Sequence, residues 1–160
     1  MKHSAGILIF RINGKEQLEF FLVHNGGPFF KDKDDGFWTI PKGELEKGEK
    51  SDEDMFQRAH KEVYEETGIL LPQEKNNYFY LNSIKQKNAK IVHAWAIKYH
   101  WHGLLKQHMI EIEYPYKSGK KIKIPEIDKA GYFTEEKARK KNNQAQLPFI
   151  ERVKSIIAKK

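Results

Sequence analysis

The chain has 160 residues, enough for one compact domain with a hydrophobic core, and we expect a single domain over residues 1–160. Hydrophobic residues make up 39% and aromatic residues 12%, which is typical of a folded protein; the absence of cysteine excludes disulfide frameworks and thiolate zinc sites. The formal net charge of +7 favours partners that carry phosphate groups, without distinguishing nucleotides from nucleic acid.

No segment of the sequence predicts a membrane partner. The apolar stretch at residues 7–10 is too short for a signal peptide, and no apolar run approaches the roughly 20 residues that span a bilayer. We therefore expect a cytoplasmic protein.

The first part of the chain predicts a β-hairpin followed by a short strand. Residues 5–12 and 18–24 are rich in β-forming residues, and between them stand Asn13 and Gly14, a pair typical of hairpin turns because both residues tolerate positive φ. A third, short strand is predicted at residues 37–40.

A helix is predicted between Ser51 and Gly68. Ser51 and Asp54 have the spacing of a capping box, and Gly68 is a typical C-terminal cap. Apolar residues recur between them at intervals of three and four, as in a helix packed on a core: Met55, Phe56, Ala59 and Val63.

The later sequence predicts three strands and two helices. Residues 78–84, 91–101 and 109–114 are β-like, and the middle stretch lacks alternation around residues 91–97, which indicates a strand covered on both faces. Helices are predicted at residues 134–141 and at the C-terminus, where Pro148 suits a first turn. The pattern as a whole indicates an α/β domain with helices on a sheet.

Three carboxylates crowd one face of the central helix. At about 100° per residue, Glu65 and Glu66 lie within roughly 60° of Glu62. Like charges at this spacing weaken a helix, so a sequence chosen for stability alone would interleave lysines. Carboxylates on a rigid helix are instead suitable ligands for Mg²⁺, which prefers hard oxygen donors.

These carboxylates belong to a longer pattern. Gly43, Glu49 and the stretch Lys61-Glu62-Val63-Tyr64-Glu65-Glu66-Thr67-Gly68-Ile69 resemble the Nudix box, G-x5-E-x7-R-E-U-x-E-E-x-G-U with U aliphatic. Segments outside the box resemble a subgroup of predicted NTP pyrophosphohydrolases. The resemblance implies a Nudix hydrolase: an α/β/α sandwich with a mixed sheet that cleaves a diphosphate linkage with Mg²⁺ or Mn²⁺.

Two features of the chain depart from the Nudix box. Lys61 stands where the pattern has arginine, so the charge is kept but bidentate geometry is lost. The interval from Gly43 to Glu62 is also four residues longer than the pattern, about one helical turn. The first box glutamate is Glu49 when counted from the left and Glu53 when counted from the right; we favour Glu49.

The resemblance implies a role for each residue of the box. Glu62 and Glu66 are expected to be the main metal ligands, and Glu65 a further ligand or a group that orients water. Gly43 is expected to offer its backbone carbonyl, and Glu49 to be the remaining acidic ligand.

Groups outside the box are expected to contact the substrate or to accept a proton. Lys42 suits a substrate phosphate. Trp38 could stack on a base and His24 could contact the substrate, although packing roles in the core are the alternative for both. Glu111 and Glu113 are the candidates for a base in a later loop, unless they are exposed members of an alternating strand.

The expected partner is therefore a small nucleotide derivative such as a nucleoside triphosphate or a dinucleoside polyphosphate. An RNA 5′ end is a less favoured substrate. The alternative to an enzyme is a non-catalytic Nudix-like module that binds a nucleotide or RNA; such modules commonly lose box glutamates, which this sequence retains.

Overall fold

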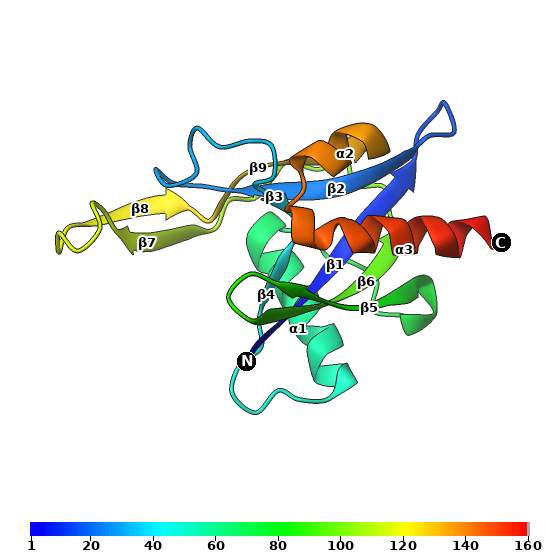
Figure 1. Ribbon diagram of the computed structural model, residues 1–160, viewed down its shortest axis with the longest axis horizontal. Coiled ribbons are helices and arrows are strands. Elements are labelled where there is room, and N and C mark those ends of the chain that lie inside the picture. The colour runs from blue at the N-terminus through cyan, green and yellow to red at the C-terminus, as the bar shows by residue number, and fades with distance from the viewer. Residues whose placement is uncertain (160) are drawn as a thin grey trace.

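The computed structural model describes residues 1–159, which fold around a seven-stranded mixed sheet (Figure 1). Its strands are β1 (Lys2–Ile12), β2 (Leu18–Asn25), β3 (Trp38–Thr39), β4 (Lys42–Glu44), β5 (Tyr78–Gln86), β6 (Lys90–Lys98) and β9 (Ile127–Thr134). The order is β3-β2-β1-β6-β5, with β4 paired to β1 and β9 paired to β2. β1 and β6 run parallel, and the other pairs in the sheet are antiparallel.

Three helices and a separate hairpin complete the described part of the chain. The helices are α1 (Asp52–Thr67), α2 (Glu135–Lys141) and α3 (Leu147–Ala158), with 3-10 turns η1 (Lys75–Asn77) and η2 (Gln144–Gln146). Strands β7 (Met109–Glu113) and β8 (Lys121–Pro125) pair with each other and project from the body of the molecule; we call this hairpin the arm (Figure 1). Within residues 1–159, no helix is both long and apolar enough to cross a membrane.

Two hydrophobic clusters lie on opposite faces of the sheet. On one face, α1 packs Met55, Phe56 and Val63 against residues of β1 and β2 such as Ile7 and Phe21. On the other face, α3 packs residues such as Phe149 and Val153 against the alternate residues of the same strands. Because side chains alternate along a strand, β1 and β2 each contribute to both clusters. This arrangement confirms the predicted α/β/α sandwich.

The first hairpin forms where it was predicted, although its loop differs from a two-residue turn. The positive φ of 59° belongs to Glu16 and not to Asn13 or Gly14. The Asn13 side-chain oxygen accepts hydrogen bonds from the amides of Lys15 (2.8 Å) and Gln17 (3.0 Å). The asparagine therefore stabilises a longer loop through its side chain.

Helix α1 begins and ends as predicted. Ser51 and Asp54 form a reciprocal capping box, and Gly68 adopts a φ of 82° while its amide bonds to the Tyr64 carbonyl at 2.8 Å. Helices α2 and α3 also form, with Pro148 in the first turn of α3. The central strand is confirmed as β6, whose apolar residues 94–97 are buried.

Three strands, β4, β8 and β9, are not among the predicted elements. The apolar pattern of β8 is weak in the sequence, because Lys121 and Lys123 alternate with Ile122 and Ile124. Ile124 is buried and packs against Gly27, so the strand gains one apolar face only after the loop that follows β2 folds onto it.

Candidate active site

The site lies where strand β4 pairs with β1 beneath α1. β1 pairs with β2 through residues 10–12 and with β4 through residues 4–6, so β4 occupies the space left as β1 and β2 diverge. A Cβ atom added to Gly43 would lie 2.0 Å from the carboxyl carbon of Glu62. The glycine therefore allows the β4 backbone to approach the acidic face of the helix.

The three box glutamates of α1 differ in exposure. Glu66 is 6% exposed, and its Oε2 atom has no hydrogen-bond partner. Glu62 is half-buried, and Glu65 is exposed at the rim of the site. An unpaired buried carboxylate oxygen is costly, which makes Glu66 the place where a cation would gain most.

The surroundings of these acids favour their neutral forms. Burial, together with the charges of Glu126 and Glu62, raises the pKa of Glu66 well above its ordinary value. Burial and the charge of Glu65 likewise raise the pKa of Glu62, against the opposing charge of Arg58. Burial lowers the pKa of Lys42, while the charge of Glu66 acts to raise it. Glu66 and Lys42 thus lie in one poorly solvated environment.

A buried arginine that the Nudix box does not contain holds the acidic cluster together. The guanidinium of Arg58 donates to both carboxylate oxygens of Glu49, at 3.0 and 3.2 Å. It also lies 3.3 Å from Glu46 and 3.5 Å from Glu62. Lys61, which occupies the arginine position of the motif, is exposed.

Arg58 could have been identified from its spacing. It stands four residues, about one helical turn, before Glu62 and therefore faces the same side of the helix. The structure also brings Glu49, and not Glu53, to this cluster. Glu53 instead contacts Lys75 and Gln57.

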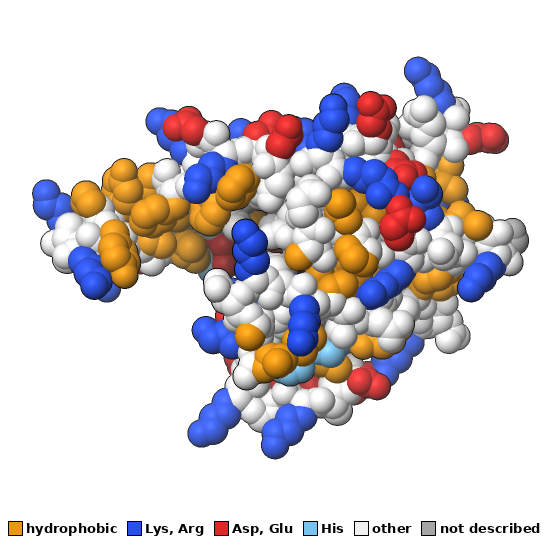
Figure 2. Space-filling view, viewed as in Figure 1, with side chains coloured by type: hydrophobic (Ala, Val, Ile, Leu, Met, Phe, Trp, Pro, Cys, Tyr) orange, Lys and Arg blue, Asp and Glu red, His pale blue; other side chains and the backbone are white. Residues whose placement is uncertain are grey.

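Glu126 is an acidic residue of the site that the sequence analysis missed. It lies between β8 and β9, and its charge raises the pKa of both Glu62 and Glu66. Its backbone carbonyl accepts a hydrogen bond from the amide of Gly26 at 2.9 Å. Figure 2 shows acidic side chains recessed in the notch between the arm and the body. The only signal in the sequence is an acid that follows the alternating stretch 121–125.

Glu111 and Glu113, the predicted candidates for a base, lie on the arm in other contacts. Glu111 is exposed and lies 3.8 Å from Lys121. The carboxylate of Glu113 accepts hydrogen bonds from the amides of Lys117 and Gly119 and thereby holds the turn of the arm. The structure therefore does not group these two acids with the glutamates of α1.

Trp38 and His24 lie in the interior and contact each other. The Trp38 ring is buried in the cluster under α3, on the face of the sheet opposite α1, and its indole N–H donates to Asp34 at 2.7 Å. The two nitrogens of His24 lie 2.7 Å from the Asp128 carboxylate and 2.6 Å from the Lys33 carbonyl. The packing alternative describes both side chains, because neither ring is free to contact a substrate.

The donor set fits a hard divalent cation. Glu62 and Glu66 supply carboxylate oxygens, one of them buried without a partner, and the Gly43 backbone lies against them. Residues 1–159 contain no preassembled group of three or more histidine, aspartate or glutamate side chains arranged as a metal cage. Mg²⁺ does not require one, because it usually binds through one or two carboxylates together with water and substrate phosphates.

Comparisons with known proteins agree with this geometry. A sequence model of the NUDIX domain matches residues 2–153. No curated protein matches the chain. Among solved structures, a binary complex of an Ap4A hydrolase from C. elegans matches 100% of both chains with a TM-score of 0.66 and 21% identity.

Two further solved structures have the same fold. The NUDIX domain of Shewanella oneidensis NrtR, complexed with ADP ribose, has a TM-score of 0.63 at 15% identity, over 97% of this chain and 87% of that one. The E. coli ORF135 protein has a TM-score of 0.62 at 21% identity, over 100% of this chain and 93% of that one. At these identities the likeness concerns the fold.

The chain belongs to the NUDIX family. This membership confirms the predicted family and fold.

Proposed function

We propose that this single-domain protein hydrolyses a diphosphate linkage in a nucleoside diphosphate derivative, with Mg²⁺ or Mn²⁺ held by Glu62 and Glu66. The observation that carries the proposal is the buried Glu66 carboxylate, which has an unpartnered oxygen and faces Glu62, Glu126 and Lys42. A bound divalent cation would neutralise phosphate charge at this position.

The surrounding residues have the remaining roles in metal binding, positioning, phosphate binding and proton transfer. Exposed Glu65 is a further ligand at the rim, and the Gly43 backbone contributes a carbonyl oxygen. Arg58 holds Glu49 and also lies beside Glu62, so the Arg58–Glu49 pair fixes the position of the acidic cluster. Lys42 binds a substrate phosphate, and Glu126 accepts the proton of the attacking water.

The substrate class is a small nucleotide derivative with a phosphoanhydride bond. Nucleoside triphosphates and dinucleoside polyphosphates are the leading candidates, and the similarity of fold to an Ap4A hydrolase supports testing the latter first. An RNA 5′ end is the less favoured substrate. The cytoplasmic location stays a prediction.

The test is a cleavage assay on ATP, dGTP, diadenosine tetraphosphate, ADP-ribose and triphosphorylated RNA, with Mg²⁺, Mn²⁺ or EDTA. Glu66→Gln removes the buried carboxylate while keeping its shape, and Glu53→Gln is the matched control on the same helix. We expect metal-dependent cleavage that Glu66→Gln lowers at least about 100-fold, because a direct ligand matters more than the groups that orient it.

Each outcome of the assay decides the proposal. Cleavage that persists at the wild-type rate in EDTA would contradict metal dependence. Unchanged activity of Glu66→Gln would remove this carboxylate from the site. Loss of activity in the Glu53→Gln control, with the fold intact by circular dichroism, would move the site toward the N-terminus of α1.

A further inference from the structure

The buried imidazole of His24 lies between two hydrogen-bond acceptors. The side chain is 1% exposed, and its Nδ1 atom lies 2.7 Å from a carboxylate oxygen of Asp128 on β9. On the other side of the ring, Nε2 lies 2.6 Å from the backbone carbonyl of Lys33, in the loop of residues 26–37 that joins β2 to β3. A carboxylate and a carbonyl only accept, so both contacts are hydrogen bonds only if both ring nitrogens donate.

Two donating nitrogens require a positively charged ring. A neutral imidazole has one N–H and would turn a lone pair toward one of the two acceptors, whereas the imidazolium donates on both sides. Placing the proton on Asp128 is less favourable, because an imidazole is ordinarily more basic than a carboxylate. The Asp128 side chain is also 26% exposed, so its charge keeps some contact with water. The geometry therefore makes His24 a buried cation.

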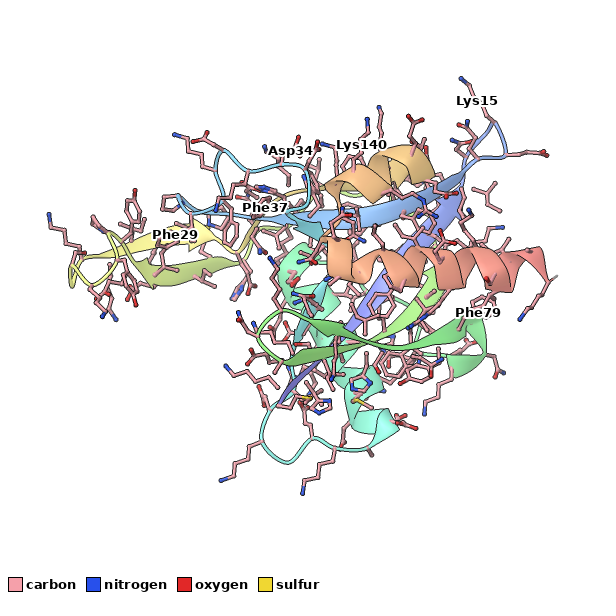
Figure 3. All side chains as sticks on the ribbon, in the orientation of Figure 1. Lys15, Phe29, Asp34, Phe37, Phe79 and Lys140 are labelled. Carbon is pink, nitrogen blue, oxygen red and sulfur yellow. The ribbon has the colours of Figure 1, made fainter. Side chains whose placement is uncertain are left out.

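Asp128 is the counter-ion of this cation, because the other charged groups near the ring are balanced or solvated. Asp34, whose carboxyl group interacts with the charge of His24, is paired with Lys141 at 2.8 Å. Figure 3 labels Asp34 in the loop beside α2. Lys129 pairs with His24 across the sheet but is exposed, so water screens its charge.

Asp128 reaches His24 from a β-bulge in β9. His24 pairs with Lys129, but the next residue of β2, Asn25, pairs with Ile127, so Asp128 is an additional residue between the two pairs. A bulge redirects a side chain and bends its strand, and bulges are frequent beside active sites. The ion pair with His24 gives the redirected carboxylate a fixed partner and thereby holds the bulge.

Glu126 lies between the two segments that His24 holds. It stands two residues before the bulge, and its carbonyl accepts from the amide of Gly26, the first residue of the loop, at 2.9 Å. Its carboxylate acts electrostatically on Glu62 and Glu66. A shift of the bulge or of the loop would displace this carboxylate, and a displacement of about 1 Å at a reacting group lowers a rate by as much as about 100-fold.

We propose that His24 is a buried imidazolium that acts as a positioning residue: it holds the bulge at Asp128 and the loop of residues 26–37, and through them it directs Glu126 toward the acids of α1. The positioning role rests on the proposed function, in which Glu126 accepts the proton of the attacking water. It gives His24 a part in the reaction that needs no contact with the substrate.

The charge on His24 is measured by NMR of the ring nitrogens in isotope-labelled protein at neutral pH. We expect both nitrogens of His24 to carry a proton in wild type. In Asp128→Asn the new amide can donate to Nδ1, so a neutral ring with its proton on Nε2 satisfies both contacts, and we expect a single protonated nitrogen there. A single protonated nitrogen in wild type would overturn the buried cation.

The positioning role is measured by turnover with Mg²⁺, on the substrate of the cleavage assay above that wild type hydrolyses fastest. We expect Asp128→Ala to lower kcat about 10-fold while KM stays within about twofold, because the change acts through Glu126. Asp128→Asn, which restores both contacts of the ring, should stay within about threefold of wild type. The matched control is Asp32→Ala, an exposed acid on the same loop, which should leave both constants unchanged.

The route through Glu126 is tested in the Glu126→Gln background, where Asp128→Ala should cause no further loss of kcat. An equal loss in both backgrounds, with the fold intact by circular dichroism, would make the role of Asp128 merely structural and overturn the positioning. Unchanged kinetics of Asp128→Ala, or an equal loss in Asp32→Ala, would overturn it as well. If wild type cleaves no substrate of the assay, the proposed function fails and the positioning role fails with it, whereas the NMR result still decides the charge on His24.

Discussion

Replacing Arg58 tests whether it has taken over the task of the arginine in the Nudix box. The side chain is 6% exposed and pairs with Glu49 and Glu62, whose side chains are 19% and 15% exposed. Arg58→Met keeps the apolar stem of the side chain and removes its charge. The control is Lys61→Ala, at the exposed position where the motif has arginine.

The expected effect follows from burial. Breaking a buried ion pair by removing one partner costs about 3–5 kcal/mol, because the remaining charge is left uncompensated. The pair with Glu46 adds little, because Glu46 is 73% exposed and screened by water. We expect Arg58→Met to lower the free energy of unfolding by about 3 kcal/mol and Tm by roughly 6–12 °C. Lys61→Ala should stay within about 0.5 kcal/mol of wild type.

The assay is urea unfolding followed by circular dichroism, with catalytic turnover measured on the same preparations. Arg58→Met should also lower kcat about 10-fold, because Glu62 loses the group that positions it. Arg58→Lys should restore the charge without the bidentate contact. Its stability and its kcat should therefore lie between those of wild type and those of Arg58→Met. The assigned role of Arg58 is refuted if Arg58→Met is as stable and active as wild type while Lys61→Ala shows the losses.

Three further predictions concern neighbouring features. Gly43→Ala should lower kcat at least about 10-fold, since its Cβ would overlap the Glu62 carboxyl group; unchanged kinetics would contradict the observed approach. Ser51→Ala should cost about 1 kcal/mol in urea unfolding and leave kcat unchanged, and full stability would show that the capping box contributes nothing. Glu126→Gln should lower kcat about 100-fold and Glu111→Gln should not; the reverse order would return the base to β7.

The sequence determined the local structure around the acids. The capping box at Ser51, the glycine at residue 68 and the apolar repeat between them are interactions among neighbours in the chain, so helix α1 could be predicted with both of its ends. The helical period then places Glu62 and Glu66 on one face. The family resemblance depended on part of the same stretch, together with Gly43, Glu49 and segments outside the box.

Contacts between distant segments were decided only by the tertiary structure. Glu126 reaches the acids because β9, which it directly precedes, pairs with β2 in the sheet, some 60 residues after α1, and no local pattern encodes that pairing. Trp38 is an aromatic beside the motif, yet the alternation of a short strand turns its ring toward α3. Arg58 reaches Glu62 because it lies about one helical turn earlier on the same side of α1, whereas Lys61, at the motif position, is exposed. Burial depends on the whole fold. It distinguishes the residues that form the site from those that lie near it only in the sequence.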